Sequence, residues 1–298
     1  MNLKPWIEAA RLRTLPLALS SIIMGTATAI HFGYFSWAVF LLAVLTTVFL
    51  QVLSNFANDY GDAVSGKDNA ERIGPQRAVA SGAINAESMK KAVILFAGLS
   101  FLSGLALLFV AFQNWLMILV FILIGLAAIA AAIKYTVGKN PYGYNGLGDI
   151  FVFIFFGLVG VLGSYFLYGK SFEVMAILPA STIGLLSVAV LNLNNMRDIV
   201  NDEKTGKHTL AVKLGLKKAK QYEYLVIVFA FLFLIAFALL QNFELKQYLF
   251  LVIAPFFAQM IKKFLSIFEP QKFDAYLKNV ALGTFVLSIL FLVGIILV

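Results

Sequence analysis

Two clusters of polar side chains stand out in an otherwise apolar sequence. They are Asn55, Asp59 and Asp62 in the first cluster, and Asn194, Asp198 and Asp202 in the second. Residues three or four positions apart share one face of a helix, so the members of each cluster can converge on one ligand. Carboxylates are expensive beside hydrocarbon, and a divalent cation that carries a phosphate is the partner that best compensates a pair of them. The spacing therefore predicts an enzyme that binds Mg²⁺ and diphosphate.

Basic residues on the same predicted side of the membrane as both clusters strengthen this interpretation. They are Lys67, Arg72, Arg77, Lys139, Arg197 and Lys207. Guanidinium and ammonium groups can bind the phosphate oxygens that a metal leaves uncovered. The alternative is that the acids only flank helices as solvated ends. Solvated ends scatter their acids, whereas one Asn and two Asp recur here on one face, twice.

The composition places these clusters in a membrane. The 298 residues are 61% hydrophobic and 13% charged, and the mean hydropathy is +0.90, which leaves too little polar surface for a soluble globule. We expect an all-α protein, a polytopic bundle of nine transmembrane helices in a single domain, 1–298. The predicted spans, each long enough to cross about 30 Å of hydrocarbon, are 15–33, 36–57, 91–112, 115–134, 147–168, 174–194, 222–241, 246–266 and 278–298.

The basic residues fix an orientation for these spans. The chain has 23 Lys and Arg and a net charge of +8, and all of them except Lys170 and Lys246 fall on one side of the predicted topology. The positive-inside rule makes that side cytoplasmic, together with the N-terminus and both acidic clusters. We therefore expect a multi-pass protein of the inner (cytoplasmic) membrane. Nucleic acid is not an expected partner, because the basic residues lie at helix ends without an aromatic recognition module.

Eight short motifs give the chain a family resemblance. They are NFANDYGD at 55–62, RIGPQR at 72–77 and SG at 81–82, then YTVGK at 135–139, PYGY at 141–144, GLGD at 146–149, NNMRDIVND at 194–202 and GKHTL at 206–210. With these motifs in this order, residues from about 10 to 215 resemble the UbiA superfamily of intramembrane prenyltransferases. Within that superfamily the chain is most similar to the type that acts on 1,4-dihydroxy-2-naphthoate.

The resemblance implies a fold and a site. It implies a nine-helix bundle with a cytoplasmic active site, a lipid-facing opening for the isoprenoid tail, and two Asp-rich motifs that bind Mg²⁺ and diphosphate. Asn55, Asp59 and Asp62 match the first motif, and Asp198 and Asp202 match the second. Many relatives have a further Asp four residues after the position of Asp62, but this chain has Gly66 there. The next acid is Asp68, and its part in the site stays open.

The resemblance also implies an activity. A polyprenyl chain would pass from its diphosphate to 1,4-dihydroxy-2-naphthoate, with loss of CO₂, to give demethylmenaquinone. Tyr135 and Lys139 could contact the diphosphate or the acceptor, or could anchor a helix end at the membrane interface. Asp149 could orient the acceptor or cap a helix.

Two other functions remain open at this point. The acceptor could be a different aromatic acid, such as 4-hydroxybenzoate. More remotely, the acids could bind the coupling ion of a membrane transporter. Transporters place such acids near the middle of the bilayer, whereas these clusters lie at the ends of predicted helices.

Overall fold

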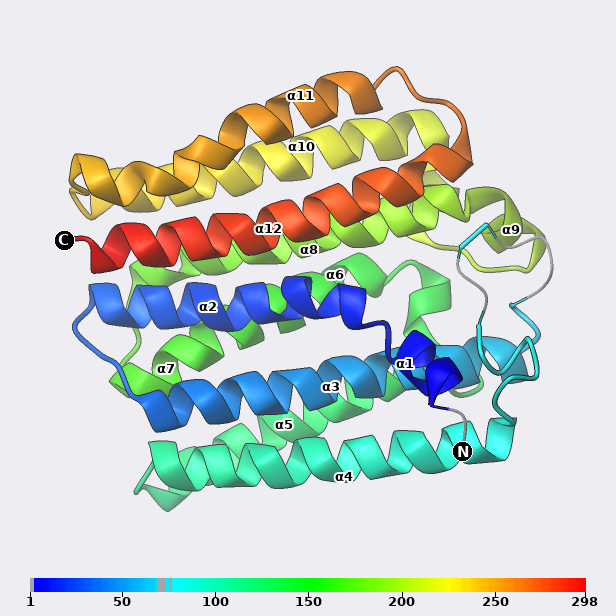
Figure 1. Cartoon of the computed structure of the whole chain (residues 1–298), viewed down its shortest axis with the longest axis horizontal. Coiled ribbons are helices and arrows are strands. Elements are labelled where there is room, and N and C mark those ends of the chain that lie inside the picture. The colour runs from blue at the N-terminus through cyan, green and yellow to red at the C-terminus, as the bar shows by residue number, and fades with distance from the viewer. Residues whose placement is uncertain (1–2, 69–72, 75–76) are drawn as a thin grey trace.

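The protein is a bundle of long helices that lie side by side (Figure 1). The structure, a computed structural model, describes residues 3–68, 73–74 and 77–298. The elements of the first half are α1 (Lys4–Ala10), η1 (Leu12–Thr14), α2 (Leu15–His31), α3 (Trp37–Val64), α4 (Ala86–Ala111), α5 (Trp115–Lys134) and η2 (Tyr142–Asn145).

The second half contains shorter and more varied segments. They are α6 (Gly148–Val152), η3 (Phe153–Gly163), α7 (Ser164–Gly169), η4 (Val174–Ala176), α8 (Ile177–Arg197), α9 (Ile199–Lys204), α10 (Leu210–Leu240), η5 (Leu245–Ile253), α11 (Ala254–Phe264), η6 (Pro270–Lys272) and α12 (Phe273–Ile296). The segment η3 is a π-helix, continuous with α6 before it and α7 after it.

Polar residues mark where several helices begin. Ser36 precedes α3 and accepts a hydrogen bond from the Val39 amide, and Asn85 does the same for α4 through the Ser88 amide. Asn114 and Thr209 cap α5 and α10 in the same way. Such caps satisfy backbone N–H groups that have no partner within the helix.

The helices agree with a multi-pass membrane protein. Within the described residues, eight helices are long and apolar enough to cross a membrane. The remaining predicted span, 246–266, is occupied by η5 followed by α11, so the count of nine stays a prediction. Helix α3 continues to Val64, seven residues past its predicted end, and α10 begins at Leu210 rather than 222. Hydropathy misses both extensions because they contain charged residues, which are Asp59 and Asp62 in the first and Lys213, Lys217, Lys218 and Lys220 in the second.

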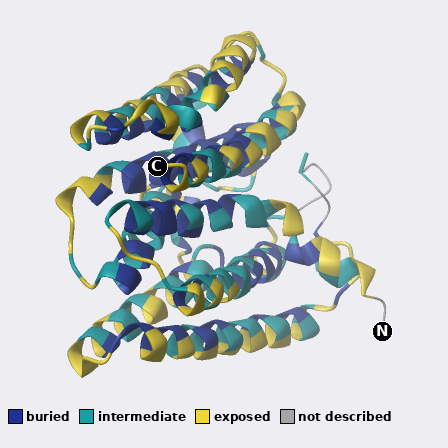
Figure 2. Cartoon of the chain, turned by 60° about the vertical axis from the view of Figure 1, so that its left-hand side comes forward, coloured by how far each residue is buried: buried dark blue, intermediate teal, exposed yellow. Residues whose placement is uncertain are grey.

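Burial divides the bundle into an inner and an outer set of helices. The centre, which includes α2, α8 and α12, is mostly buried, and the outer faces of α4 and α5 are exposed (Figure 2). Large apolar side chains such as Leu116 and Leu123 on α5 are exposed there, as expected of a lipid-facing surface. Helices α1 and α9 lie at the same end of the bundle, on the right in Figure 1.

Candidate active site

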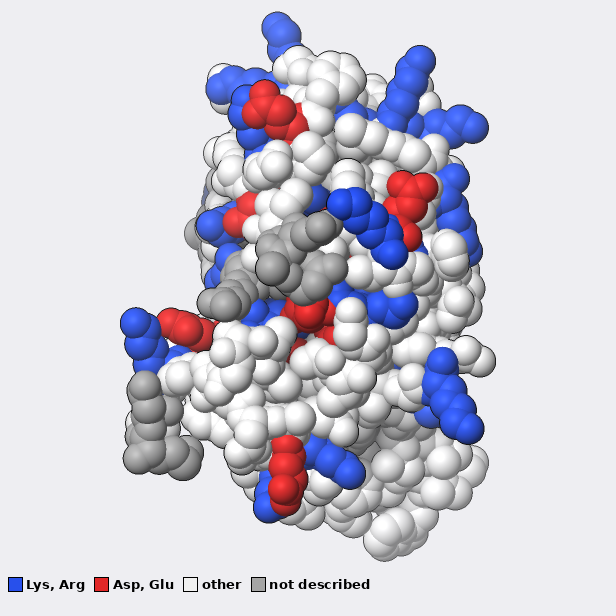
Figure 3. All heavy atoms as spheres, turned by 90° about the vertical axis from the view of Figure 1, so that its right-hand side faces the viewer, with Lys and Arg blue, Asp and Glu red and all other residues white. Residues whose placement is uncertain are grey.

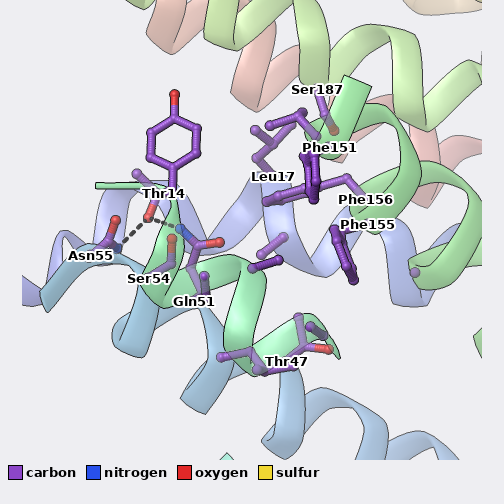
Figure 4. Close-up of a pocket in the computed structure, with 18 of the residues that line it drawn as sticks. Thr14, Leu17, Thr47, Gln51, Ser54, Asn55, Phe151, Phe155, Phe156 and Ser187 are labelled. Carbon is purple, nitrogen blue, oxygen red and sulfur yellow. Dashed lines mark hydrogen bonds between the residues drawn. The ribbon is translucent and has the colours of Figure 1, made fainter. Parts of the chain in front are cut away.

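The main cavity of the protein lies inside the bundle and has a volume of about 650 Å³. Its walls come from α2, α3, α4, α5, α6, η3, α8 and α12. Figure 4 shows Phe151, Phe155 and Phe156 together on one side, away from the polar side chains of Gln51 and Asn55. The polar lining at the end where α3 and α8 finish includes Asn58, Asp62, Arg77, Asn194, Asp198, Asp202 and Lys207. The cavity therefore joins a charged end to an apolar interior.

Asp62 accepts three side-chain hydrogen bonds at the charged end of the cavity. Its carboxylate accepts hydrogen bonds from Arg77 Nη2 at 2.6 Å, from the Tyr144 hydroxyl at 2.6 Å and from Lys207 Nζ at 2.9 Å. The side chain is only 2% exposed. Burial alone would lower the pKa of the Arg77 guanidinium, but the nearby carboxylates of Asp62 and Asp68 outweigh it and raise this pKa. A buried carboxylate is tolerated here because two cations and a hydroxyl surround it.

Lys207 joins the two acidic clusters. Its ammonium lies 2.9 Å from Asp62 on α3 and 3.9 Å from Asp202 on α9. The structure thus brings together residues 140 positions apart, as the topology predicted from the sequence requires. It also shows that one positive charge can lie between carboxylates of both clusters. Figure 3 shows this end of the molecule, where basic side chains surround acidic ones.

Arg197 is bound to acids of the protein itself. It forms a paired contact with Asp198, Nε to Oδ1 at 3.0 Å and Nη2 to Oδ2 at 2.6 Å. It also donates to Asn194 at 2.9 Å and to Asp274 of α12 at 2.8 Å. The side chain is 2% exposed. Arg197 therefore connects the end of α8 to α12, and its donors are engaged by protein groups.

Asp59 departs from the predicted trio. Its two carboxylate oxygens accept hydrogen bonds from the backbone amides of Ala78 and Val79, each at 3.0 Å. It does not line the cavity, whereas Asn58, one residue earlier, does. The segment after α3 folds back over the helix, and its amides need buried acceptors. Asn58 was missed because it fits the same helical spacing as Asp59 but carries no charge.

Two further predicted residues, Asn55 and Lys67, and Asp68, whose part was left open, are bound by groups of the protein itself. Asn55 lines the cavity, yet its side-chain amide donates to the Ala10 carbonyl and to Thr14, as Figure 4 shows for Thr14. Lys67 donates to the Thr205 carbonyl. Asp68 forms an ion pair with Arg77 Nε at 3.3 Å. The predicted residue Arg72 lies outside the described residues.

The segment after α5 contributes one of its three predicted residues to the cavity. Tyr135 lines it, whereas Asp149 is buried outside the lining and Lys139 is exposed. Gly143 and Gly148 leave room for Tyr135, because a Cβ added at either would lie 3.0 to 3.3 Å from its ring. Burial, followed by the charge of Asp149, raises the pKa of Tyr135 well above its ordinary value. Its hydroxyl therefore stays protonated and can donate a hydrogen bond.

Sequence reasoning missed several lining residues. Tyr144 binds Asp62, and burial together with the charge of that carboxylate raises the pKa of its hydroxyl. Its position in the PYGY motif at 141–144 could have marked Tyr144 as a candidate site residue. Arg11 and Arg13 also line the cavity, whereas the pattern of basic residues in the sequence indicated only a topology for this segment. Nothing in the local pattern shows that this segment returns to the cavity.

The donor set at the charged end suits Mg²⁺. Among the described residues, no three Asp, Glu, His or Cys side chains form a metal-binding group. The acids instead converge in a pair, Asp62 and Asp202, with the side chains of Asn58 and Asn194 in the same lining. Mg²⁺ is usually held by one or two carboxylates and completes its shell with water and phosphate oxygens. The position of the Lys207 ammonium shows that a cation fits between these two carboxylates.

Together these features define a class of protein, a multi-pass membrane protein whose internal cavity can hold an anionic headgroup at one end and an apolar chain beyond it. A family model described as the UbiA prenyltransferase family matches residues 18–278, and the chain belongs to that family. Two similar proteins, from Haemophilus influenzae and Escherichia coli, are each named 1,4-dihydroxy-2-naphthoate octaprenyltransferase. The first is 45% identical over 98% of this chain and 96% of its own length, and the second is 43% identical over 97% and 94%.

Solved structures of more distant proteins share the fold. A UbiA homolog from Aeropyrum pernix K1 superimposes with a TM-score of 0.65 at 18% identity and covers 100% of this chain and 98% of its own. A UbiA homolog from Archaeoglobus fulgidus bound to GPP and Mg²⁺ gives 0.63 at 14% identity, with 96% and 99% covered. At this level of identity the likeness establishes the architecture of the bundle.

Proposed function

We propose that this protein transfers a polyprenyl chain from its diphosphate to 1,4-dihydroxy-2-naphthoate, with loss of CO₂, to form demethylmenaquinol, the reduced form of demethylmenaquinone, in menaquinone biosynthesis. The observation that carries the proposal is the meeting of Asp62, Asp202 and two cations at the polar end of an apolar cavity. The choice of acceptor is supported by the names of relatives that are 43% and 45% identical over nearly the whole chain.

The charged end would hold the diphosphate of the substrate. Asp62 and Asp202, with the amide oxygens of Asn58 and Asn194, are the residues that would hold Mg²⁺. When bound, Mg²⁺ supplies positive charge against the diphosphate as the allylic C–O bond breaks. Arg77 and Lys207, which bind Asp62 at 2.6 and 2.9 Å, are placed to stabilise the leaving anion in the same way.

Two tyrosine hydroxyls add neutral donors. Tyr135 and Tyr144 both line the cavity. Because burial raises the pKa of each, both remain protonated around neutral pH. They can donate hydrogen bonds to diphosphate or acceptor oxygens while they keep their own protons.

The apolar walls favour the carbon chemistry. When the C–O bond breaks, its electron pair leaves with diphosphate and the prenyl carbon becomes an allylic cation. A ring carbon of the acceptor forms the new C–C bond, CO₂ leaves, and its bonding pair restores the aromatic ring. Phe151, Phe155 and Phe156 keep water from the cation, and their ring faces stabilise positive charge.

The orientation is part of the proposal. We place the charged end of the bundle in the cytoplasm and the protein in the inner membrane, because nearly all Lys and Arg fall on that side of the predicted topology.

The test is to identify the product. Proteoliposomes of the purified chain are given octaprenyl diphosphate, Mg²⁺ and either 1,4-dihydroxy-2-naphthoate or 4-hydroxybenzoate, and quinones are analysed by mass spectrometry. We expect demethylmenaquinol from the naphthoate, detected as demethylmenaquinone after oxidation in air, no product after chelation of Mg²⁺, and recovery when Mg²⁺ is returned. Prenylation of 4-hydroxybenzoate with no conversion of the naphthoate would overturn the assigned acceptor.

A further inference from the structure

Lys220 is a buried cation that does not line the central cavity. Its side chain is 5% exposed. The ammonium group donates hydrogen bonds to the carbonyls of Leu265 and Ile267, each at 2.6 Å, and lies 4.2 Å from the ring centroid of Phe268. These contacts compensate the buried charge. They also hold the turn that follows α11 against α10.

This turn borders a surface groove between α10 and α11. The groove is lined by Gln221, Tyr224, Leu225 and Leu265. Further along the two helices, Phe231 of α10 meets Phe257 of α11 edge to face, with ring centroids 5.2 Å apart. The backbones of α10 and α11 make few direct contacts along the described chain. Aromatic side chains thus keep the two helices apart, and the groove between them is open at the surface.

An apolar face of α10 continues the groove toward the middle of the bundle. Leu225, Phe229 and Leu232 follow one another at the four- and three-residue spacing that places side chains on one face of a helix. All three side chains are exposed. On a helix that crosses the membrane, such a face meets hydrocarbon. An acyl chain can therefore lie along it.

Four exposed lysines surround the polar end of the groove. They are Lys217 and Lys218 of α10, and Lys262 and Lys263 of α11. The first pair lies one turn before Gln221, and the second pair lies in the last turn of α11, just before Leu265. Within the described part of the chain, none of the four ammonium groups has a hydrogen bond or an ion pair. Their charge is therefore available to a ligand outside the protein.

The acids close to these lysines in the sequence do not neutralise them. Glu223 is buried and accepts a hydrogen bond from Asn192, and Glu269 is paired with Lys272. Basic side chains also predominate in the upper part of Figure 3, which is the end of the bundle where α10 and α11 meet. The groove thus joins uncompensated positive charge to an exposed apolar surface.

We propose that the groove between α10 and α11 is a binding site for an anionic phospholipid. The four lysines bind the phosphate of the headgroup, and one acyl chain lies along the face of Leu225, Phe229 and Leu232. Basic pockets between transmembrane helices recognise anionic headgroups in this way. A prenyl diphosphate has similar chemistry, but the charged end of the cavity already accounts for its diphosphate. The inference does not depend on the proposed reaction.

The first test measures lipid retention. The delipidated chain in detergent is mixed with phosphatidylglycerol or with phosphatidylcholine of the same acyl chains, and bound lipid is measured by native mass spectrometry. We expect the unmodified chain to prefer phosphatidylglycerol by about fivefold or more. In Lys217→Gln/Lys218→Gln and in Lys262→Gln/Lys263→Gln, the preference should fall to about twofold or less. Because all four lysines are exposed and unpaired, the melting temperature should stay the same.

Lys90→Gln/Lys91→Gln is the matched control. These two adjacent lysines of α4 are exposed, and the exposed apolar residues Ile94 and Leu95 follow them on the same helix. They lie outside the groove. The control removes the same charge and should keep the preference for phosphatidylglycerol. An equal loss in the control and in the groove variants, or no preference in the unmodified chain, would overturn the inference.

A fluorescence measurement locates the acyl chain. The chain has no cysteine, so Leu225→Cys and Leu95→Cys each provide a single site for a bimane fluorophore. The labelled protein is placed in phosphatidylcholine vesicles that contain a lipid with a spin label on its acyl chain, either phosphatidylglycerol or phosphatidylcholine. At position 225 we expect the labelled phosphatidylglycerol to quench bimane about threefold more strongly, and at position 95 we expect the two lipids to quench equally.

Two outcomes of the fluorescence measurement contradict the proposal. Equal quenching by the two lipids at position 225 would show that the groove has no selective occupant. Quenching at position 225 that octaprenyl diphosphate relieves and unlabelled phosphatidylglycerol does not would assign the groove to the prenyl substrate instead.

Discussion

The two acidic clusters have nearly the same composition, yet the fold uses them differently. In the first, on the unbroken helix α3, Asp59 binds the backbone of Ala78 and Val79 and Asp62 faces the cavity. In the second, at the break between α8 and α9, Asp198 is paired with Arg197 and Asp202 faces Lys207. In each cluster one acid is bound by other protein groups, Asp59 by two backbone amides and Asp198 by Arg197, and the other acid lies beside the shared cation Lys207. A repeated motif in the sequence thus contains two kinds of acid.

The largest expected loss of activity comes from substituting Asp202, the acid of the second cluster that faces Lys207. Asp202→Asn should lower the rate of prenyl transfer at least a thousandfold, about 4 kcal/mol, because the diphosphate loses part of its binding site. Asparagine keeps the size and shape of the aspartate side chain, so we expect the melting temperature to change much less than the activity. The measurement is transfer per folded molecule beside a thermal melt. Glu87→Gln, on an exposed acid, is the control, and activity within threefold of the unmodified chain would remove Asp202 from the site.

Asp59→Asn should show the opposite pattern. One carboxylate oxygen becomes an NH₂ group facing a buried backbone amide, which costs roughly 2 to 3 kcal/mol of folding free energy. We expect a clear loss of thermal stability in detergent, with transfer per folded molecule within about fivefold of the unmodified chain. A stable protein without activity would show that Asp59 binds substrate, and the contrast between the two acids would disappear.

Lys207 connects the clusters, and its charge can be tested separately from its size. Lys207→Gln should reduce kcat/KM about thirtyfold, roughly 2 kcal/mol, and Lys207→Arg should recover part of that loss because it keeps the charge. Lys91→Gln, on an exposed lysine paired with Glu87, is the control. An equal loss in the Gln and Arg variants would mean that shape matters here rather than charge.

The smallest effect is expected at Tyr144. Tyr144→Phe removes the hydroxyl that donates to Asp62 at 2.6 Å, and we expect about a fivefold loss of kcat/KM, or 1 kcal/mol. The pKa of this hydroxyl lies above its ordinary value of 10.0, so its protonated form persists as the pH rises to 9. The ratio of kcat/KM of the unmodified chain to kcat/KM of Tyr144→Phe should therefore be the same at pH 7 and pH 9. A ratio that narrows toward pH 9 would show that the hydroxyl ionises in this range.

Much of the fold could be predicted from the sequence, because apolar segments of sufficient length leave few alternatives to transmembrane helices. The predicted helix 115–134 coincides with α5. The polar ends of the helices were harder to predict. The apolar stretch of α3 ends before Asn58, but the helix itself continues to Val64. The predicted span 246–266 is divided at Ile253 into a 3₁₀ segment and an α-helix, with Pro255 in the first turn of the latter.

The site was predicted in outline, and its details depend on long-range contacts. Helical spacing placed Asn55, Asp59 and Asp62 on one face, but such a face is wide enough to include Asn58 as well. Which of these residues meets the cavity is decided by the return of 77–79 over α3, a contact that local pattern cannot reveal. Lys207 was predicted because it lies near Asp202 in the sequence. Tyr144 received no role because its contact with Asp62 joins two distant segments.

The most direct test of the central claim is a double-mutant cycle on the binding of inorganic diphosphate in the presence of Mg²⁺. Dissociation constants are measured for the unmodified chain, Asp62→Asn, Asp202→Asn and the double variant. If the two carboxylates share one cation site, either substitution removes most of the affinity, and the double variant should bind at least tenfold more tightly than additive effects would give, a coupling of about 1.4 kcal/mol or more. Additive effects, within about 0.5 kcal/mol, would contradict the account and place the two acids in separate sites.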